Sequence, residues 1–327
     1  MFKARFLLQA VVLALFLGAC TAGGTAPSPS TSTPAPSATP LSPTPTLPPT
    51  PIAVQDGSGQ TVRLTHPATR IVSLAPSNTE ILFAIGAGSQ MVGRDEFSDY
   101  PTEAKSLPSI STSMGTLNTE ALVALQPDLV LAAPILAPEQ IQTLRNLGLT
   151  VFLVPNPTDF DGLYQNLANV GALTGRGDEA QALVSRSRQR VAAVEQVISK
   201  ATSKPKVFYE LDGSDPGKPW TAGPGNFIDL IIRVAGGQNA AAGLQEAYAQ
   251  ISVEELLSQN PDVIILGDTA YGITVASVEA RPGWNVMNAI KNNAVDPFDD
   301  NLASRPGPRL IDGLEAMAKL VHPELFK

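Results

Sequence analysis

The chain has 327 residues, 43% of them hydrophobic, and a formal net charge of −8, which allows two medium-sized domains with buried cores. This acidic balance argues against a nucleic-acid partner, which needs clustered lysine and arginine, and against spreading on an anionic membrane. With one cysteine and two histidines, the chain cannot form an intramolecular disulfide or a cysteine-based zinc site, and direct capture of a first-row metal is not expected.

Residues 1–20 have the pattern of a secretory signal. Lys3 and Arg5 precede an apolar run over residues 6–17, which is shorter than the ~20 residues that span a bilayer. The small residues before Cys20 resemble a bacterial lipobox, and this resemblance implies cleavage before Cys20 and attachment of lipid to its thiol. The alternative is an ordinary signal peptide with an incidental cysteine.

Residues 21–51 contain no charged residue and are mostly Thr, Pro and Ser. Such a segment cannot bury enough apolar surface to fold. We therefore predict a disordered tether.

Residues 52–159 are predicted to form a first lobe. Asp56-Gly57 between apolar alternations favours a small hairpin. Residues 70–75 form a buried strand, and Ser77-Asn-Thr-Glu80 is interpreted as a capping box that opens a helix over residues 80–85. Further strands are expected at 91–93, 129–132 and 150–154, with a helix at 138–147. This alternation of strand and helix predicts an α/β layer with a mainly parallel sheet.

Residues 160–203 are predicted to be a helical connector. The apolar pattern from Asp178 to Ala201 indicates one helix about 36 Å long. A single long helix is a stiff joint, which predicts small lobe closure. The second lobe, residues 204–327, begins with a strand at 206–210, and its other helices are expected at 227–234 and 310–320.

One helix–turn–strand unit occurs twice. Residues 118–132 and 252–266 each contain Pro-Asp before an apolar strand, and Glu120 and Glu254 each stand seven residues before the proline. A unit repeated at matched spacing indicates two similar lobes. The predicted fold is therefore two similar α/β lobes with mainly parallel sheets, joined by one long helix, with a ligand cleft between them.

Ligands of open α/β sheets bind beyond the carboxyl ends of the strands. The residues expected there are Pro76, Ser77, Arg94, Phe97 and Tyr100 in the first lobe and Tyr209, Trp220, Tyr271, Trp284 and Arg305 in the second. Such a set suits a large, flat, partly apolar ligand. The alternatives are that both tryptophans fill the lobe core, and that arginines such as Arg281 and Arg309 form ion pairs with the protein's own acids.

No motif of a known catalytic site is present. The sequence lacks Gly-x-Ser-x-Gly, a Walker loop and His-Glu-x-x-His, and neither His66 nor His322 falls on a predicted cleft loop. We expect a protein that is not an enzyme and has no catalytic residues. A surface hydrolase and a signalling or adhesion module are the competing classes.

Glu120 and Glu254 have two interpretations. An acid in the first turn of a helix is favoured by the helix dipole by ~0.3–1 kcal/mol. The equal offset in both lobes instead favours a symmetric pair of carboxylates that suits a two-fold symmetric, basic partner.

The ordered motifs resemble the helical-backbone metal-chelate receptors, the solute-binding proteins of ABC importers for vitamin B12, ferric siderophores and haem. The resemblance covers roughly residues 52–327. It rests on Arg70-Ile-Val-Ser-Leu-Ala-Pro-Ser-Asn-Thr-Glu, Asn118-x-Glu120, Gln126-Pro-Asp-Leu-Val, Trp220-x-x-Gly223, Pro261-Asp-Val-Ile-Ile, Arg281-Pro-Gly-Trp284 and Arg305-Pro-Gly-Pro-Arg309.

The resemblance implies a chelate held between the lobes, with Pro76, Trp220 and Arg305 at cleft positions. It also implies that Glu120 and Glu254 dock on the transmembrane subunits of an ABC importer. Residues 209–239 most resemble the cobalamin-binding branch, although Asn301 stands where B12 binders carry an aspartate. We therefore expect a monomeric receptor that is lipid-anchored through Cys20 outside the cytoplasm. It would need no cofactor and would deliver a corrinoid, with a ferric siderophore or haem as the alternative ligand.

Overall fold

The computed structural model describes residues 51–111 and 116–326. The predicted signal segment, the lipid attachment at Cys20 and nearly all of the tether lie outside these residues. None of the helices in the described ranges combines the length and the apolar character needed to cross a membrane.

The first lobe contains a parallel sheet of four strands in the order β4-β3-β5-β6. Its strands are β3 (Ile71–Ser73), β4 (Met91–Arg94), β5 (Leu129–Ala132) and β6 (Val151–Leu153), and its helices are α1 (Pro76–Ala84), α2 (Thr119–Ala124) and α3 (Pro138–Asn146). The predicted hairpin is present as the antiparallel pair β1 (Ile52–Gln55) and β2 (Thr61–Leu64).

The second lobe contains a mixed sheet in the order β10-β8-β7-β11-β12, with β9 also paired to β7. The parallel strands are β7 (Lys206–Asp212), β9 (Gln238–Asn239), β11 (Val263–Leu266) and β12 (Val295–Pro297); the strands added in antiparallel fashion are β8 (Trp220–Ala222) and β10 (Tyr248–Gln250). The helices are α6 (Phe227–Val234), α7 (Val253–Gln259), α8 (Val275–Glu279), α9 (Asn288–Lys291) and α10 (Leu310–Val321).

Both faces of each central strand are buried, which is why these segments are continuous apolar runs. In β5, Leu129 and Leu131 belong to one hydrophobic cluster, whereas Val130 belongs to another on the opposite face of the sheet. The same alternation holds in β11, where Ile265 and Ile264 join different clusters. Side chains of successive strand residues point to opposite faces, so each sheet separates two apolar layers.

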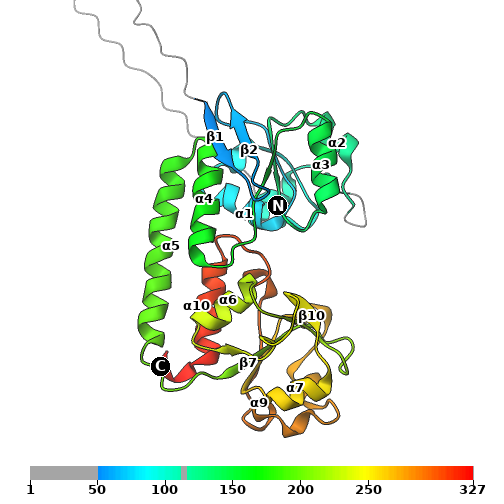
Figure 1. Cartoon of the computed structure of the whole chain (residues 1–327), viewed down its shortest axis with the longest axis vertical. Helices are drawn as coiled ribbons and strands as arrows, with labels where there is room; N and C mark the ends of the chain where they lie inside the picture. Colours follow the sequence, from blue (N-terminus) through cyan, green and yellow to red (C-terminus); the bar gives the residue numbers. More distant parts are fainter. Residues whose placement is uncertain (1–50, 112–115, 327) are drawn as a thin grey trace, which may run out of the picture. The chain divides into compact units, whose positions relative to one another are not determined.

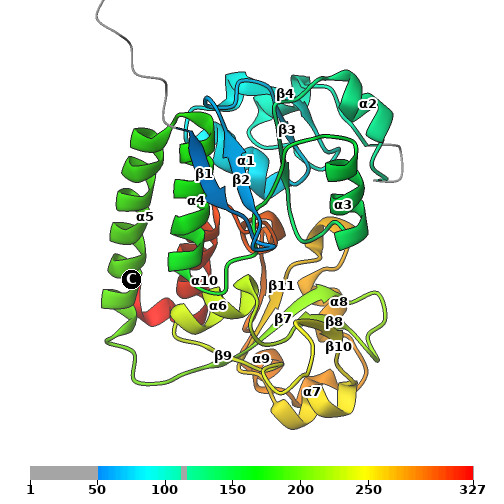
Figure 2. The same cartoon turned by 45° about the horizontal axis from the view of Figure 1, so that its top comes forward.

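The lobes are joined by α4 (Phe160–Thr174) and the long helix α5 (Gly177–Ile198), which lie side by side in both views (Figures 1 and 2). The structure confirms the predicted long helix. Arg190 of α5 binds Asp312 and Glu315 of α10 at 2.6 and 2.7 Å, which fixes α5 to the second lobe.

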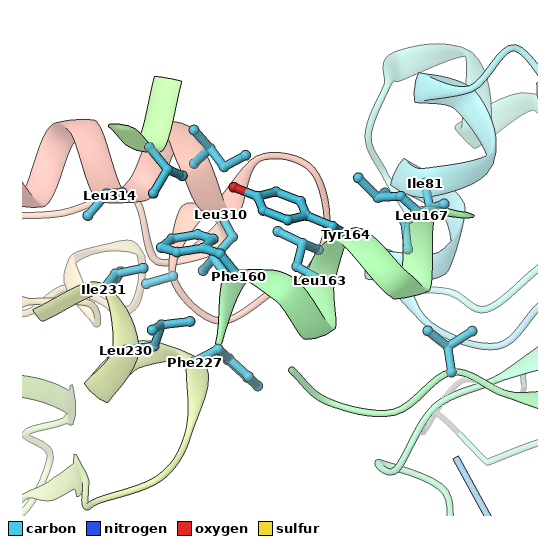
Figure 3. Close-up of a cluster of buried hydrophobic side chains, with 14 of the residues drawn as sticks. Ile81, Phe160, Leu163, Tyr164, Leu167, Phe227, Leu230, Ile231, Leu310 and Leu314 are labelled. Carbon is cyan, nitrogen blue, oxygen red and sulfur yellow. The ribbon is translucent and has the colours of Figure 1, made fainter. Parts of the chain in front are cut away.

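A single apolar cluster continues from the first lobe through the connector into the second lobe. Ile81 of α1, Leu163 and Leu167 of α4, Ile231 of α6 and Leu310 of α10 all belong to it (Figure 3). The two lobes are therefore joined by shared core as well as by a chain crossing.

The start of α1 differs from the prediction. The helix begins at Pro76, where a proline fits because the first helical N–H needs no partner. No side chain caps it, so the predicted capping box of Ser77 and Glu80 is wrong. Glu80 lies in the second turn, and its side chain is buried.

Candidate ligand-binding site

The carboxyl ends of both sheets carry the polar and aromatic loops that the sequence places at a ligand site. In the first lobe, α1 follows β3 and the loop Asp95–Tyr100 follows β4. In the second lobe, a short 3₁₀ turn at Thr269–Tyr271 follows β11, and another at Asp300–Leu302 follows β12. These are the positions at which open α/β sheets bind ligands.

The second lobe has a cavity of about 480 Å³ at the ends of β11 and β12. It is lined by Gly267, Thr269, Ala270, Tyr271, Pro297, Phe298, Asp299, Asp300 and Asn301. Tyr271 is 87% exposed, so its ring is available to a ligand. The Asn301 amide donates to Asp299 at 2.9 Å.

Asp300 is the deepest acid of this cavity. Its carboxylate accepts bonds from Tyr209 and Ser304, each at 2.7 Å. Burial raises the pKa of Asp300, although these two hydrogen bonds lower it. Burial and the charge of Asp300 raise the pKa of Tyr209 well above its usual value, so the Tyr209 hydroxyl stays a donor to the carboxylate.

The first lobe has a smaller cavity of about 140 Å³ that is more apolar. It is lined by Leu74, Pro76, Asp95, Phe97, Ile110, Ser111, Leu117, Ile135, Leu136 and Gln140. Phe97 is 61% exposed. This lining offers an apolar surface for a flat ligand, with the Asp95 carboxylate as its only acid.

The loop after β4 is held by a buried hydrogen-bond network. Asp95 accepts bonds from the Ser98 hydroxyl and, at 2.9 Å, from the Phe97 N–H. Thr79 of α1 donates to Ser98 at 2.8 Å. Burial raises the pKa of Asp95, and the bond from Ser98 opposes this. The network fixes the backbone on which Phe97 and Asp99 stand.

Two arginines from the second lobe cross to acids of the first lobe. Arg309 binds both carboxylate oxygens of Glu80 through its Nε and Nη2 atoms, at 3.0 and 2.6 Å, and lies 3.9 Å from the centre of the Tyr100 ring. Arg305 binds Asp99 at 2.7 Å and lies 3.6 Å from Glu80. This inter-lobe cluster lies close to the acids of the second cavity, because the charge of Arg305 acts on Asp300. In the first lobe, Asp99 stands two residues after Phe97, which lines the other cavity.

Several predicted site residues lie at these two cavities. Tyr271 and Asn301 line the second cavity, and Pro76 and Phe97 line the first. Tyr100 packs on the inter-lobe cluster. Trp220, on β8, is 43% exposed and lies outside both cavity linings. An exposed aromatic side chain thus lines each cavity, and Trp220 lines neither.

Tyr209 and Trp284 do not lie on the cleft surface, so the prediction that they contact the ligand is wrong. Both are fully buried, at 0% and 1% exposed. Trp284 makes an edge contact with Phe208 with the ring centres 6.4 Å apart, and the Arg281 guanidinium lies over the Trp284 ring, 4.5 Å from its centre. Trp284 therefore fills the second-lobe core, which was the alternative given above.

Arg94 and Ser77, two further predicted site residues, make contacts within the protein. The Arg94 guanidinium donates to the carbonyl oxygens of Asp95 and Glu96 at 2.8 and 3.1 Å, so it braces its own loop. Ser77 is buried, and its carbonyl oxygen lies 3.2 Å from where a Cβ on Gly307 would stand. Ser77 is thus part of the contact between the lobes.

The four arginines considered as ligand contacts all have partners in the chain. Arg281 forms a buried pair with Glu210 at 2.5 and 2.9 Å, and Arg94, Arg305 and Arg309 are held as described. Neither cavity is lined by an arginine or a lysine. In the described ranges, no group of three His, Cys, Asp or Glu residues is arranged to hold a metal ion.

The sequence reasoning missed the role of Glu80 as a buried partner of Arg309. Glu80 carries a recognisable signal, since an acid inside the mostly apolar helix Pro76–Ala84 needs a partner when it is buried. The neighbouring sequence does not indicate which residue is that partner, because Arg309 lies 229 residues away.

Glu120 and Glu254 occupy the same place in the two lobes. Each stands in the first turn of its helix, α2 or α7, and each is exposed. Asn118 caps α2 by accepting from the Ala121 N–H at 3.0 Å, and Ser252 caps α7 by accepting from Glu255 at 3.1 Å. The two glutamates are therefore not needed as caps, and neither forms an ion pair with another described residue.

This fold and these facing loops define a class of protein. Residues 71–301 match the family of periplasmic binding proteins. The chain belongs to that family, as the motif resemblance predicted, and the family binds substrates rather than transforming them.

Two curated relatives cover most of the chain. The uncharacterized ABC transporter substrate-binding lipoprotein YvrC of Bacillus subtilis is 34% identical over 85% of this chain and 87% of its own length. A cobalamin-binding protein of Halobacterium salinarum is 33% identical over 83% of this chain and 74% of its own length.

Solved structures with the same fold include receptors of two ligand classes. The periplasmic vitamin B12-binding protein BtuF of Vibrio cholerae matches with a TM-score of 0.69 and 28% identity, over 80% of this chain and 99% of that one. The apo form of the periplasmic haem-binding protein RhuT from Roseiflexus sp. RS-1 matches with the same TM-score and identity, over 79% and 99%. The predicted two-lobe α/β fold is confirmed.

Proposed function

We propose that this protein captures a corrinoid such as cobalamin outside the cytoplasm and delivers it to an ABC importer. The observation that carries this proposal is the chemistry of the two cavities, which offer carboxylates, amides and exposed aromatic rings but no arginine or lysine. Cobalamin presents carboxamide N–H groups around a broad corrin ring. These groups suit acceptors such as Asp299 and Asp300, while Tyr271 and Phe97 suit the ring.

The names of the relatives support the same ligand. The Halobacterium salinarum relative and the Vibrio cholerae structure are named for cobalamin and vitamin B12. The Roseiflexus match keeps haem as the second candidate. Haem brings two propionates and catecholate siderophores bring more negative charge, and both would need cations that the cavity linings lack.

Delivery requires contact with the importer, which we assign to Glu120 and Glu254. They are exposed, lie at equivalent positions in the two lobes and form no ion pair with another described residue. Two such carboxylates suit two basic pockets related by a two-fold axis.

Anchoring is assigned to Cys20, whose thiol would carry lipid after cleavage of the signal segment. The lipobox-like residues before Cys20 and the named lipoprotein relative YvrC support this assignment. Mass spectrometry of the membrane-associated protein would detect the lipid at Cys20, and Cys20→Ala should release the receptor from the membrane.

The ligand is tested by titration of residues 21–327, which retain every residue of the described fold. We expect saturable one-to-one binding of cyanocobalamin with a Kd below about 10 μM. Haemin and a ferric catecholate siderophore should bind at least about tenfold more weakly, a difference of about 1.4 kcal/mol. Tighter binding of either anionic chelate than of cyanocobalamin would contradict the proposal and would favour the haem or siderophore alternative.

A further inference from the structure

The Asp99–Arg305 pair holds an arginine of the second lobe against a carboxylate of the first. Asp99 Oδ1 lies 2.7 Å from Arg305 Nη1. Arg305 is largely buried, with 15% of its side chain exposed, whereas Asp99 keeps 48%. A ligand group that approaches Arg305 therefore meets Asp99 already in place.

Asp99 has a fixed position and stays charged. The loop that carries it is held by Asp95 and Ser98, and the neighbouring Tyr100 packs on Arg309. Burial raises the pKa of Asp99, but the hydrogen bond and charge of Arg305 outweigh it and lower the pKa below its usual value. At neutral pH, Asp99 therefore neutralises Arg305 as an internal carboxylate.

The other cluster arginine is already satisfied. Arg309 is held by both oxygens of Glu80 and by the Tyr100 ring. Arg305 has one hydrogen-bonded partner, Asp99, and a longer ion pair with Glu80 at 3.6 Å. Removal of the Asp99 charge would thus leave Arg305 with only the longer contact to Glu80, whose two oxygens already bind Arg309.

We infer that Asp99 is a specificity determinant that occupies Arg305 and so excludes chelates with exposed carboxylates. This inference rests on the proposed function of the inter-lobe site as a chelate receptor. An anionic chelate would have to displace Asp99 from Arg305 and then lie beside the acids of the second cavity, Asp299 and Asp300. An amide-bearing chelate meets no such cost, since amides accept and donate without net charge.

The competing explanation is that the pair only fastens the lobes together. A fastening role predicts that loss of the Asp99 charge changes the binding of all chelates alike, through lobe geometry. A selective role predicts a change only for ligands that carry carboxylates. The two explanations are separated by a pair of ligands that differ only in those groups.

The test uses haemin and haemin dimethyl ester, which lacks free carboxylates, with cyanocobalamin as reference. Asp99→Asn should raise haemin affinity by about tenfold, the scale of one charge-assisted hydrogen bond, while the ester changes by less than about twofold. The gain should weaken with added salt and disappear in Asp99→Asn with Arg305→Met. Glu103→Gln, which removes an exposed acid of the same lobe, is the matched control and should leave haemin affinity unchanged.

The inference falls if haemin affinity does not rise in Asp99→Asn, or if haemin and its ester gain equally. Asp99→Ser is a second variant that loses the charge in case Asp99→Asn unfolds. Failure of the wild-type protein to bind cyanocobalamin would overturn the corrinoid proposal alone, because the role of Asp99 is measured from the haemin pair.

Discussion

The two copies of the helix–turn–strand unit use the same backbone geometry with different side chains. In the first copy, Gln126 has a positive φ of 47° before its Pro-Asp, and in the second Asn260 has 46°. Asp128 then accepts from the Arg70 N–H at 3.0 Å, and Asp262 accepts from the Lys206 N–H at 2.9 Å. The aspartate thus ties the start of one strand to the start of the next in both lobes.

The copies differ in which side chain donates hydrogen bonds to the carbonyl groups at the end of the helix. Arg70 donates to the carbonyl oxygens of Leu125 and Gln126 at 2.6 and 3.1 Å, from an exposed position. Lys206 donates to the Gln259 carbonyl at 2.7 Å and is half-buried. The repeated feature is therefore a set of backbone bonds, and different basic residues satisfy it. The glutamate seven residues before the proline has no part in these bonds, so they do not explain its presence in both copies. Its proposed role is docking on the importer.

The largest expected effect is on docking to the importer. Glu120→Arg combined with Glu254→Arg should reduce ligand uptake to background, because both proposed contacts with basic importer pockets become repulsive. Ligand affinity should change by less than about twofold, since neither residue lines a cavity. The measurements are uptake of labelled ligand by cells that depend on this receptor, and titration of the purified variant.

The matched control for the uptake experiment is Glu139→Arg with Glu279→Arg. It reverses one exposed glutamate in each lobe at non-equivalent positions. Uptake should persist in this control. Normal uptake by the Glu120 and Glu254 double variant would remove the docking assignment and leave the repeat as a purely structural feature.

The next largest effect is expected on stability, when the aspartate of each copy is replaced. Asp262→Ala should lower the free energy of unfolding by about 2–3 kcal/mol and Asp128→Ala by about 1–2 kcal/mol. The order follows from burial, because the donors left by Asp262 are half-buried and those left by Asp128 are exposed to water. Urea unfolding measures both values.

Glu139→Ala is the control for the aspartate pair and should change the free energy of unfolding by less than about 0.5 kcal/mol. A larger loss from Asp128→Ala than from Asp262→Ala would show that burial does not set the difference between the copies.

The smallest effect has opposite signs in the two copies. Gln126→Gly should raise the free energy of unfolding by about 0.5 kcal/mol, because glycine adopts positive φ without strain. Asn260→Gly should lower it by about 1 kcal/mol, because the Asn260 side chain accepts from the Asn288 N–H at 2.8 Å. Thermal or urea unfolding distinguishes the signs.

Asn293 is the control for this pair, since it has a positive φ of 53° and no hydrogen bond from its side chain is seen in the described ranges. Asn293→Gly should change stability by less than about 0.5 kcal/mol. Equal signs for Gln126→Gly and Asn260→Gly would mean that the Asn288 bond contributes nothing measurable.

The fold was predictable because its signals are local or periodic. Matched Pro-Asp turns before apolar runs indicated two similar sheets, and the apolar period of residues 178–201 indicated the long helix. The structure confirms both, with α5 at Gly177–Ile198. Antiparallel β8 and β10 carry no comparable signal, since neither is an aliphatic run.

The candidate site was predictable at its loops and less so at its side chains. Tyr271 and Phe97 follow strands and are exposed, as expected. Trp284 also follows a turn, but Phe208 and Arg281 enclose it, and no spacing in the sequence reports that contact. The Asp99–Arg305 pair spans 206 residues and depends on how the lobes meet.

The apolar cluster that runs through both lobes sets a limit on the width of the site. Separation of the lobes would expose this core to water, at about 2.5 kcal/mol for each 100 Å² of apolar surface. We therefore expect the spacing between the two lobes to stay nearly constant. For the proposed receptor, this spacing would select chelates by their dimension across the ring, because a thicker ligand would have to push the lobes apart.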